Sequence, residues 1–132
     1  MINKNKVSLI DSQDAVYGNI TYDLASLIDD VRLKTSKNNK ELIYQSYFNL
    51  NKKKINKIKF KNDFEILSVL RNLKIIGIFT RLATRDKKKK YLKLIPYAWH
   101  LIELRIKNNV TFKDLKHCLD INFPKKIRLL IK

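Results

Sequence analysis

The sequence predicts a mainly α-helical fold, with five or six helices after one short N-terminal strand, in a single domain covering residues 1–132. Apolar residues recur at the three- and four-residue spacing of amphipathic helices over most of the chain. The chain holds only two Gly and two Pro, which is too few for the turns of a β-sandwich or barrel. Its hydrophobic content of 45% is sufficient for a packed core.

The first half of the chain is expected to form the strand and two helices. Residues 7–10 are largely apolar and predict the strand, which leads into Asp11. An apolar stripe at helical spacing predicts a helix over residues 21–33, with Thr21 as its N-cap. After a polar turn, a similar pattern predicts a second helix over residues 40–50.

The second half begins with the basic stretch 52–61, which is expected to be either a loop or a short amphipathic piece. Asn62 or Asp63 then caps the longest helix, residues 64–84, whose apolar positions nearly circle its axis. We therefore expect this helix to be the buried centre of the fold. Three further helices are expected over residues 91–107, 111–119 and 124–131, with Pro96 near the start of the first and Pro124 opening the last.

The chain is strongly basic, with 29 Lys and Arg against 12 Asp and Glu and a formal net charge of +17. Such an excess favours binding to nucleic acid through phosphate contacts, here by residues 52–61 and 87–93. The alternative is that an AT-rich gene enriches the chain in Lys, Asn and Ile without a functional basic surface. Composition leaves both interpretations open.

Cysteine content and hydropathy exclude other classes. The single Cys118 cannot form an internal disulfide or a thiolate metal cage. The N-terminus has no signal-peptide pattern, and no run of 18 uncharged apolar residues predicts a membrane span. We expect a cytoplasmic protein without a membrane partner.

The acidic residues are concentrated near the N-terminus. Between Val7 and Val31 there is no Lys or Arg, although five of the twelve acids lie there. A negative segment in a basic chain is suited to a hard divalent cation, which prefers carboxylate oxygens. Asp29 and Asp30 are expected to be solvated helix residues, and Asp23 favours a helix N-terminus. The five acids are Asp11, Asp14, Asp23, Asp29 and Asp30.

Basic residues of the longest expected helix are also ordered. Intervals of three, seven and four residues place them on one side of that helix, where guanidinium and ammonium groups could bind an anion. A solvated stripe without a ligand is the alternative. The residues are Arg71, Lys74, Arg81 and Arg85.

Three segments carry a family resemblance in the same order along the chain. The chain resembles the aminoglycoside phosphotransferase family in LIDSQDAVYGNITYDLASL at residues 9–27, in RNLKIIGIFTRLATRD at 71–86 and in PYAWHLIE at 96–103. The form they resemble is that of N-acetylmuramate/N-acetylglucosamine anomeric kinases. The resemblance implies the C-terminal helical lobe of a protein-kinase-like fold, and transfer of a phosphoryl group from ATP to a sugar hydroxyl.

The resemblance also implies roles for individual residues. Asp11 corresponds to the carboxylate that holds Mg²⁺ between the nucleotide phosphates, and Asp14 would assist through water or orient the loop. Asp23 would have the structural task of hydrogen-bonding the catalytic loop. The sugar side of the site would be lined by Arg71, Lys74 and Arg81.

Some positions depart from the family pattern. Ser12 stands where the family has Phe, Asn19 where it has Pro, and Leu70 where Gln is expected. The catalytic loop His-x-Asp-x-x-x-x-Asn is absent, because neither His100 nor His117 is followed two positions later by Asp.

Without that loop no catalytic general base is assigned, and the nucleotide lobe is also absent from these 132 residues. We expect a C-terminal fragment that is inactive alone. It would be either a truncated reading frame or one piece of a split enzyme with a separately encoded N-terminal part.

Overall fold

The computed structural model describes residues 2–3, 6–7, 17–53 and 55–129, and within them it confirms a mainly α-helical fold with six α-helices. The two short strands pair antiparallel, with Ile2 opposite Val7. Of the expected strand 7–10, Val7 lies in a strand and residues 8–10 lie outside the described residues. The elements are β1 Ile2–Asn3, β2 Lys6–Val7, α1 Tyr22–Ile28, α2 Lys37–Asn51, α3 Lys57–Thr84, η2 Lys89–Leu94, α4 Ile95–Ile106, η3 Val110–Phe112, α5 Lys113–Asn122 and α6 Lys125–Leu129.

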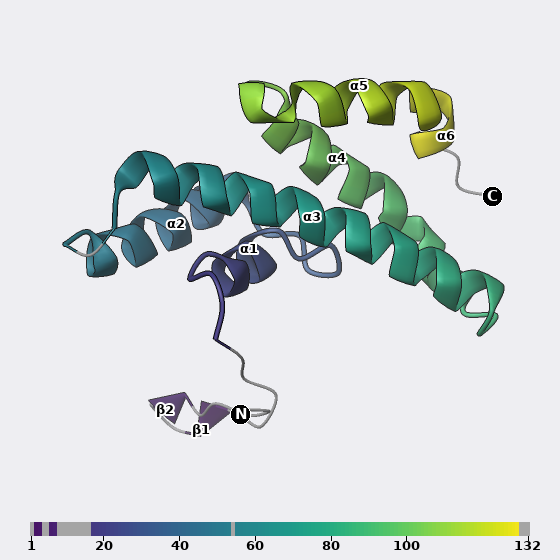
Figure 1. The fold of residues 1–132 in the computed structure, drawn as a ribbon. Coiled ribbons are helices and arrows are strands. Elements are labelled where there is room, and N and C mark those ends of the chain that lie inside the picture. Colours follow the sequence, from purple (N-terminus) through teal and green to yellow (C-terminus); the bar gives the residue numbers. More distant parts are fainter. Residues whose placement is uncertain (1, 4–5, 8–16, 54, 130–132) are drawn as a thin grey trace.

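Helix α3 is the longest element and runs through the middle of the molecule (Figure 1). α1 and α2 lie beside its N-terminal half, while α4 runs back along the C-terminal part. α5 and α6 lie on the far side of α4. The expectation of a central helix is therefore confirmed for this segment.

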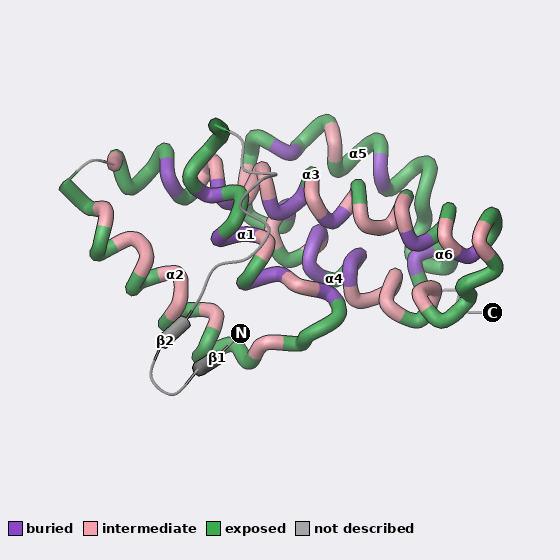
Figure 2. The backbone as a smooth tube through the Cα atoms, turned by 90° about the horizontal axis from the view of Figure 1, so that it is seen from below, coloured by how far each residue is buried: buried purple, intermediate pink, exposed green. Residues whose placement is uncertain are grey.

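Three hydrophobic clusters follow one another along α3. Phe60 and Phe64 pack with α1 and the aromatic side chains of α2. Val69 packs with α4 and α5, and Phe79 packs with α4. Figure 2 shows these buried positions as purple segments on α3 and α4, with exposed segments between them. Each cluster thus includes a side chain of α3, which joins the small helices to one framework.

The start of α3 corrects the sequence prediction. The helix begins at Lys57, seven residues before the expected Phe64, and its N-cap is Asn56 rather than Asn62 or Asp63. The side chain of Asn56 accepts hydrogen bonds from the main-chain N–H groups of Ile58 and Lys59, at 2.9 and 3.1 Å. This cap and the burial of Phe60 extend the helix backwards through the basic stretch.

The end of α1 is a second correction. The helix was expected to reach residue 33, but it ends at Ile28 with Asp29 as the C-cap. Asp29 is completely buried, whereas its neighbour Asp30 is only partly so. The side chain of Asp29 is drawn into contacts with three other helices, and the chain leaves the helical path at this residue.

The remaining helices lie close to their predicted places. α2 begins earlier than expected, because Ser36 caps it by accepting a hydrogen bond from the N–H of Asn39. Pro96 lies in the first turn of α4, where its missing N–H costs nothing. The turn before α4 is the 3₁₀ helix η2 and not the start of one long α-helix.

α6 is joined to α4 and α5 by one buried cation. The guanidinium of Arg128 binds Glu103 of α4 at 2.8 Å and Asp120 of α5 at 2.7 Å. It also lies 4.9 Å from the ring centroid of Trp99. Burial lowers the pKa of Arg128, but the hydrogen bonds and charges of Glu103 and Asp120 together raise it above the ordinary value. Arg128 therefore stays charged and connects the C-terminal helices to the centre.

No helix in the described ranges combines the length and apolar character that a membrane crossing requires.

Candidate functional site

The acidic segment is the part of the chain that the resemblance connects with metal binding. Asp11 and Asp14, the expected Mg²⁺ ligands, lie outside the described residues. Across residues 17–53 and 55–129, no three His, Cys, Asp or Glu side chains gather as a metal site. The magnesium assignment therefore stays a prediction that concerns Asp11 and Asp14 alone.

Asp23 lies in the first turn of α1 and is exposed. Its position at a helix N-terminus agrees with the sequence, because the helix dipole favours an anion there. The expected N-cap Thr21 does occupy the cap position, but its side chain forms no capping hydrogen bond. Instead, the side-chain oxygen of Asn19 accepts from the N–H and hydroxyl of Thr21, at 3.0 and 2.9 Å. Asp23 therefore takes no part in the hydrogen bonds between Asn19 and Thr21, and its side chain is exposed to solvent.

The basic residues of α3 differ in what they contact. Arg71 is half-buried, and its Nη1 donates to the main-chain carbonyl of Asp29 at 3.3 Å. Lys74 and Arg81 are exposed. Arg85 lies just beyond the helix and binds the carboxylate of Asp86 through two hydrogen bonds, at 2.6 and 3.0 Å. Of the four residues of the expected stripe, Lys74 and Arg81 present cations to solvent without a bond to another described side chain or carbonyl.

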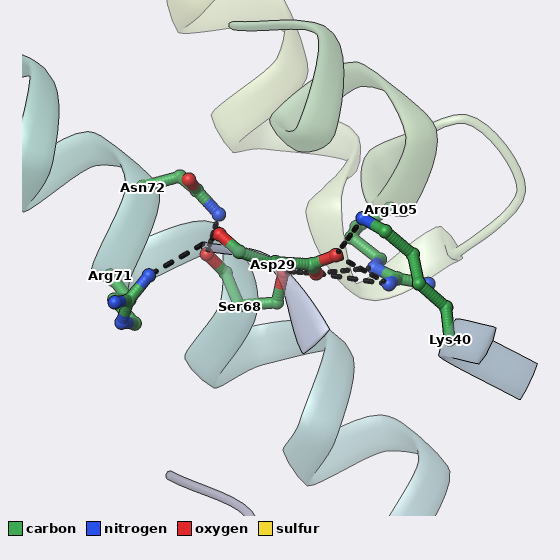
Figure 3. Close-up of polar contacts among 6 residues, drawn as sticks. All are labelled: Asp29, Lys40, Ser68, Arg71, Asn72 and Arg105. Atoms are coloured by element: carbon green, nitrogen blue, oxygen red, sulfur yellow. Dashed lines mark hydrogen bonds and ion pairs between the residues drawn. The ribbon is translucent and has the colours of Figure 1, made fainter. Parts of the chain in front are cut away.

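The main polar cluster of the structure is centred on Asp29 (Figure 3). Arg105 of α4 donates to its carboxylate from Nε at 3.1 Å and from Nη2 at 2.9 and 3.1 Å. Ser68 of α3 donates its hydroxyl at 2.6 Å. Lys40 of α2 donates from Nζ at 3.0 Å. One carboxylate at the end of α1 is thus bonded to α2, α3 and α4.

The expectation that Asp29 is a solvated residue is wrong. It is 0% exposed, and its partners Ser68 and Arg105 are 39 and 76 residues away along the chain. Asp29 and Asp30 are adjacent and follow the same apolar stripe, so the local sequence does not indicate that only Asp29 is buried. Asp30 lies beyond the end of α1 and is therefore not the helix residue that was expected, but its carboxylate binds Arg32 two residues away near the surface.

Burial raises the pKa of Asp29, since a charged carboxylate is costly away from water. The charge of Arg105 and the hydrogen bonds from Ser68 and Lys40 lower the pKa more strongly. The net result is a pKa below the ordinary aspartate value. Asp29 is therefore ionised at neutral pH and serves as the counter-charge for two cations.

Asn72 adjoins this cluster on the next turn of α3 and is fully buried. Its side-chain nitrogen donates to the carbonyl of Ser68 at 2.8 Å. Its side-chain oxygen is buried without a hydrogen-bond partner among the described residues. A buried acceptor without a partner lowers stability. The hydrogen-bonding groups at Asn72 are therefore less completely paired than those at Asp29.

Together these contacts position two parts of the expected site. α1 lies within the acidic segment, after Asp11 and Asp14 in the sequence, and the Asp29 cluster attaches its end to α3. The exposed cations Lys74 and Arg81 lie farther along the same helix α3. The helix that follows Asp11 and Asp14 is therefore held on the framework that presents the basic residues.

Comparison with known proteins identifies the class to which this sequence is similar. The relatives that match are sugar kinases, and they are named N-acetylmuramate/N-acetylglucosamine kinase. That of Caulobacter vibrioides is 30% identical over 99 residues, which cover 75% of this chain and 27% of the relative. That of Neisseria meningitidis serogroup B is 34% identical over 101 residues, covering 73% of this chain and 30% of the relative. That of Pseudomonas aeruginosa is 27% identical over 126 residues, covering 90% and 37%.

These matches confirm the resemblance to N-acetylmuramate/N-acetylglucosamine kinases that residues 9–27, 71–86 and 96–103 indicate. The chain spans only about a third of the length of the relatives, from 27% to 37%. No family model matches the chain. No solved structure matches it either.

Proposed function

We propose that this chain is the C-terminal helical part of an ATP-dependent sugar kinase of the aminoglycoside-phosphotransferase type. The observation that carries the proposal is the match to four N-acetylmuramate/N-acetylglucosamine kinases over 67–90% of the chain but only 27–37% of each relative. The nucleotide lobe and catalytic loop would come from residues outside this chain. They would lie on the same polypeptide or on a separately encoded part, and the kinase would act in the cytoplasm.

In this proposal Asp11 holds Mg²⁺ against the phosphates of ATP, and Asp14 supports it. Carboxylate oxygens are the ligands that Mg²⁺ prefers, and the segment from residue 7 to 31 contains no Lys or Arg that would oppose a cation. The structure supports a fixed position for α1, which lies in this segment, because Asp29 at its end bonds to three other helices. The bound ion would neutralise charge on the transferred phosphoryl group.

Lys74 and Arg81 are proposed to bind the sugar substrate or its developing phosphate. Both are exposed on α3, and helical geometry puts them on nearly the same side, about 10 Å apart along the axis. Arg71 is half-buried and donates to the carbonyl of Asp29. Its proposed contact with substrate would therefore involve the remaining guanidinium N–H groups, and its first effect would be on the position of α1.

A chimeric kinase tests these roles. In it, this chain replaces the matching segment of the Caulobacter vibrioides relative, which supplies the remaining 73% of the kinase. We expect the chimera to phosphorylate N-acetylglucosamine or N-acetylmuramate with ATP. We expect the 132-residue chain alone to be inactive. Robust turnover by the chain alone that disappears in Asp11→Ala would contradict the proposed division of the site.

Removing the exposed cations is expected to weaken substrate binding. In the chimera, Lys74→Gln and Arg81→Gln should each raise KM for the sugar by about fivefold, the effect of losing one charge near 4 Å in water. kcat should change less, because a substrate-binding charge acts before the chemical step. The matched control is Lys113→Gln, which removes an exposed lysine of α5. Equal KM changes in all three variants would contradict a specific role of Lys74 and Arg81.

The net charge of +17 supports a second candidate function, binding of nucleic acid by residues 52–61 and 87–93. This alternative is distinguished by the salt dependence of binding to a DNA or RNA duplex. Tight binding near physiological salt with a steep decrease at higher salt would favour it. The sugar-kinase proposal expects weak binding that disappears at physiological salt.

A further inference from the structure

A pocket between α2, the first turns of α3 and the end of α4 adjoins the Asp29 cluster and lies away from Lys74 and Arg81. Its volume is about 430 Å³, within the range of pockets that bind small molecules. Of the α3 residues that line the pocket, Glu65 is the nearest to Lys74. It lies nine positions before Lys74, which corresponds to ~13 Å along the helix. The pocket is lined by Ile28, Lys37, Lys40, Glu41, Tyr44, Gln45, Lys57, Lys61, Phe64, Glu65, Leu104 and Arg105.

One face of each helix forms the walls of this pocket. The lining residues of α2 recur at intervals of three and four, from Lys37 to Gln45, and those of α3 recur in the same way from Lys57 to Glu65. Leu104 and Arg105 come from the last two turns of α4. With Ile28 of α1, the pocket is therefore built by four helices, and the core cluster of Phe60 and Phe64 and the Asp29 cluster fix their relative positions.

The apolar part of the lining is aromatic. The ring of Phe64 is buried, and the ring of Tyr44 meets it edge to face with centroids 5.1 Å apart. The guanidinium of Arg105 lies 4.9 Å from the centroid of Phe64. These groups offer an apolar ligand ring both aromatic contact and a planar cation.

Tyr44 also contributes a polar group. Among the described residues, its hydroxyl has no hydrogen-bond partner. Burial raises the pKa of Tyr44, and the negative charges of Glu65 and Glu41 raise it further. The hydroxyl is therefore protonated at neutral pH and can donate a hydrogen bond to an anion.

Positive charge exceeds negative charge in the pocket. Five cations line it, against the carboxylates of Glu41 and Glu65 and the buried Asp29 behind them. Asp29 binds Lys40 and Arg105 together, and Glu65 lies 3.8 Å from Lys61. Lys37 and Lys57 have no carboxylate partner among the described residues. The excess of two positive charges matches the dianion of a phosphate monoester near neutral pH.

From the aromatic lining and the charge excess, we infer that this pocket binds a small organic phosphate, with its apolar ring against Phe64 and Tyr44 and its phosphate near Lys37. Two further hydrogen-bond donors are available to the phosphate. One is the guanidinium nitrogen of Arg105 that does not bond to Asp29, and the other is the Tyr44 hydroxyl. The ligand is a single small molecule and not a nucleic-acid strand, because a pocket of about 430 Å³ accommodates a ring with one phosphate. The inference does not depend on the kinase proposal.

Calorimetric titration of the full 132-residue chain with 1-naphthyl phosphate tests this inference. The neutral 1-naphthol and inorganic phosphate serve as probes for each half of the ligand. We expect saturable binding of naphthyl phosphate with one site, and at least tenfold weaker binding of either half. Lys37→Gln should weaken binding by about fivefold, and Lys57→Gln, at the opposite end of the pocket, should weaken it less. Tyr44→Phe, which retains the ring, should weaken it by about threefold.

Lys113→Gln on α5 is the matched control and should leave the dissociation constant unchanged. Circular dichroism and the thermal midpoint verify that the lysine variants are folded, since all three lysines are exposed. Absence of saturable binding at millimolar naphthyl phosphate would overturn the inference, as would equal binding of inorganic phosphate. Equal weakening by Lys113→Gln would also overturn it. Tight binding of a ten-nucleotide single strand without binding of naphthyl phosphate would identify a nucleic-acid surface instead.

Discussion

Replacing Asp29 by asparagine is expected to lower the free energy of unfolding by about 3 kcal/mol. The variant retains the shape of the side chain but removes the charge that compensates Arg105 and Lys40. Breaking a buried ion pair on one side typically costs about 3–5 kcal/mol. The lower end applies here, because Arg105 and Lys40 are 18% and 15% exposed in their side chains and retain some access to water. Denaturant titration followed by circular dichroism measures the loss.

Asp30→Asn is the matched control, because it makes the same chemical change one residue later. Asp30 pairs with Arg32 near the surface, and such pairs contribute about 1 kcal/mol or less. A second variant, Asp29→Leu combined with Arg105→Leu, should recover part of the loss, since an apolar pair can replace a buried ion pair. Equal losses for Asp29→Asn and Asp30→Asn would contradict the central position of the Asp29 cluster.

The same cluster predicts a pH dependence of stability. The pKa of Asp29 in the folded chain is below its ordinary value, whereas in the unfolded chain it is near the reference of about 3.9. The unfolded state therefore takes up a proton first as the pH falls, and the stabilisation by Asp29 is lost. The difference in unfolding free energy between the natural chain and Asp29→Asn should be constant above about pH 5. It should decrease below about pH 4, and a difference that grows with acid would contradict this.

Ile102→Ala is expected to cost about 2–5 kcal/mol, because it removes three carbon atoms from the interior and leaves a cavity. Ile102 is 0% exposed and belongs to the cluster that joins α4 to α3 and α5. Its neighbour Leu104 on the same helix is 51% exposed, so Leu104→Ala is the control and should cost much less. Equilibrium unfolding of both variants measures the difference. Equal effects would contradict the packing of this face of α4 against α3.

The sequence was sufficient for the helical class and for the places of most helices. Apolar spacing is a local property, and helices depend largely on it. The start of α3 was placed too late because five lysines between residues 52 and 59 masked the apolar spacing. The signal that could have found it is Asn56, a good N-cap residue, followed four positions later by Phe60.

The Asp29 cluster could not be predicted from local pattern. The side chains that bond to Asp29 come from positions 11, 39 and 76 residues away along the chain. Nothing in the sequence near Asp29 or Arg105 indicates that these two residues meet. A general rule still applies, because a buried carboxylate must find cations. Knowledge of that rule does not identify which of 29 basic residues are the partners. By contrast, the acidic segment and the basic residues of α3 were found from spacing and from the family resemblance.

The measurement that tests the central proposal most directly is the turnover of the chimeric kinase with and without Asp11. Asp11→Ala is expected to lower kcat on the order of 100-fold or more, the loss typical of removing one electrostatic stabiliser of a transition state. Asp30→Asn, another acid of the same segment, should retain turnover within about twofold. Unchanged phosphorylation by the Asp11→Ala chimera would contradict the assignment of this chain as the metal-binding part of a sugar kinase.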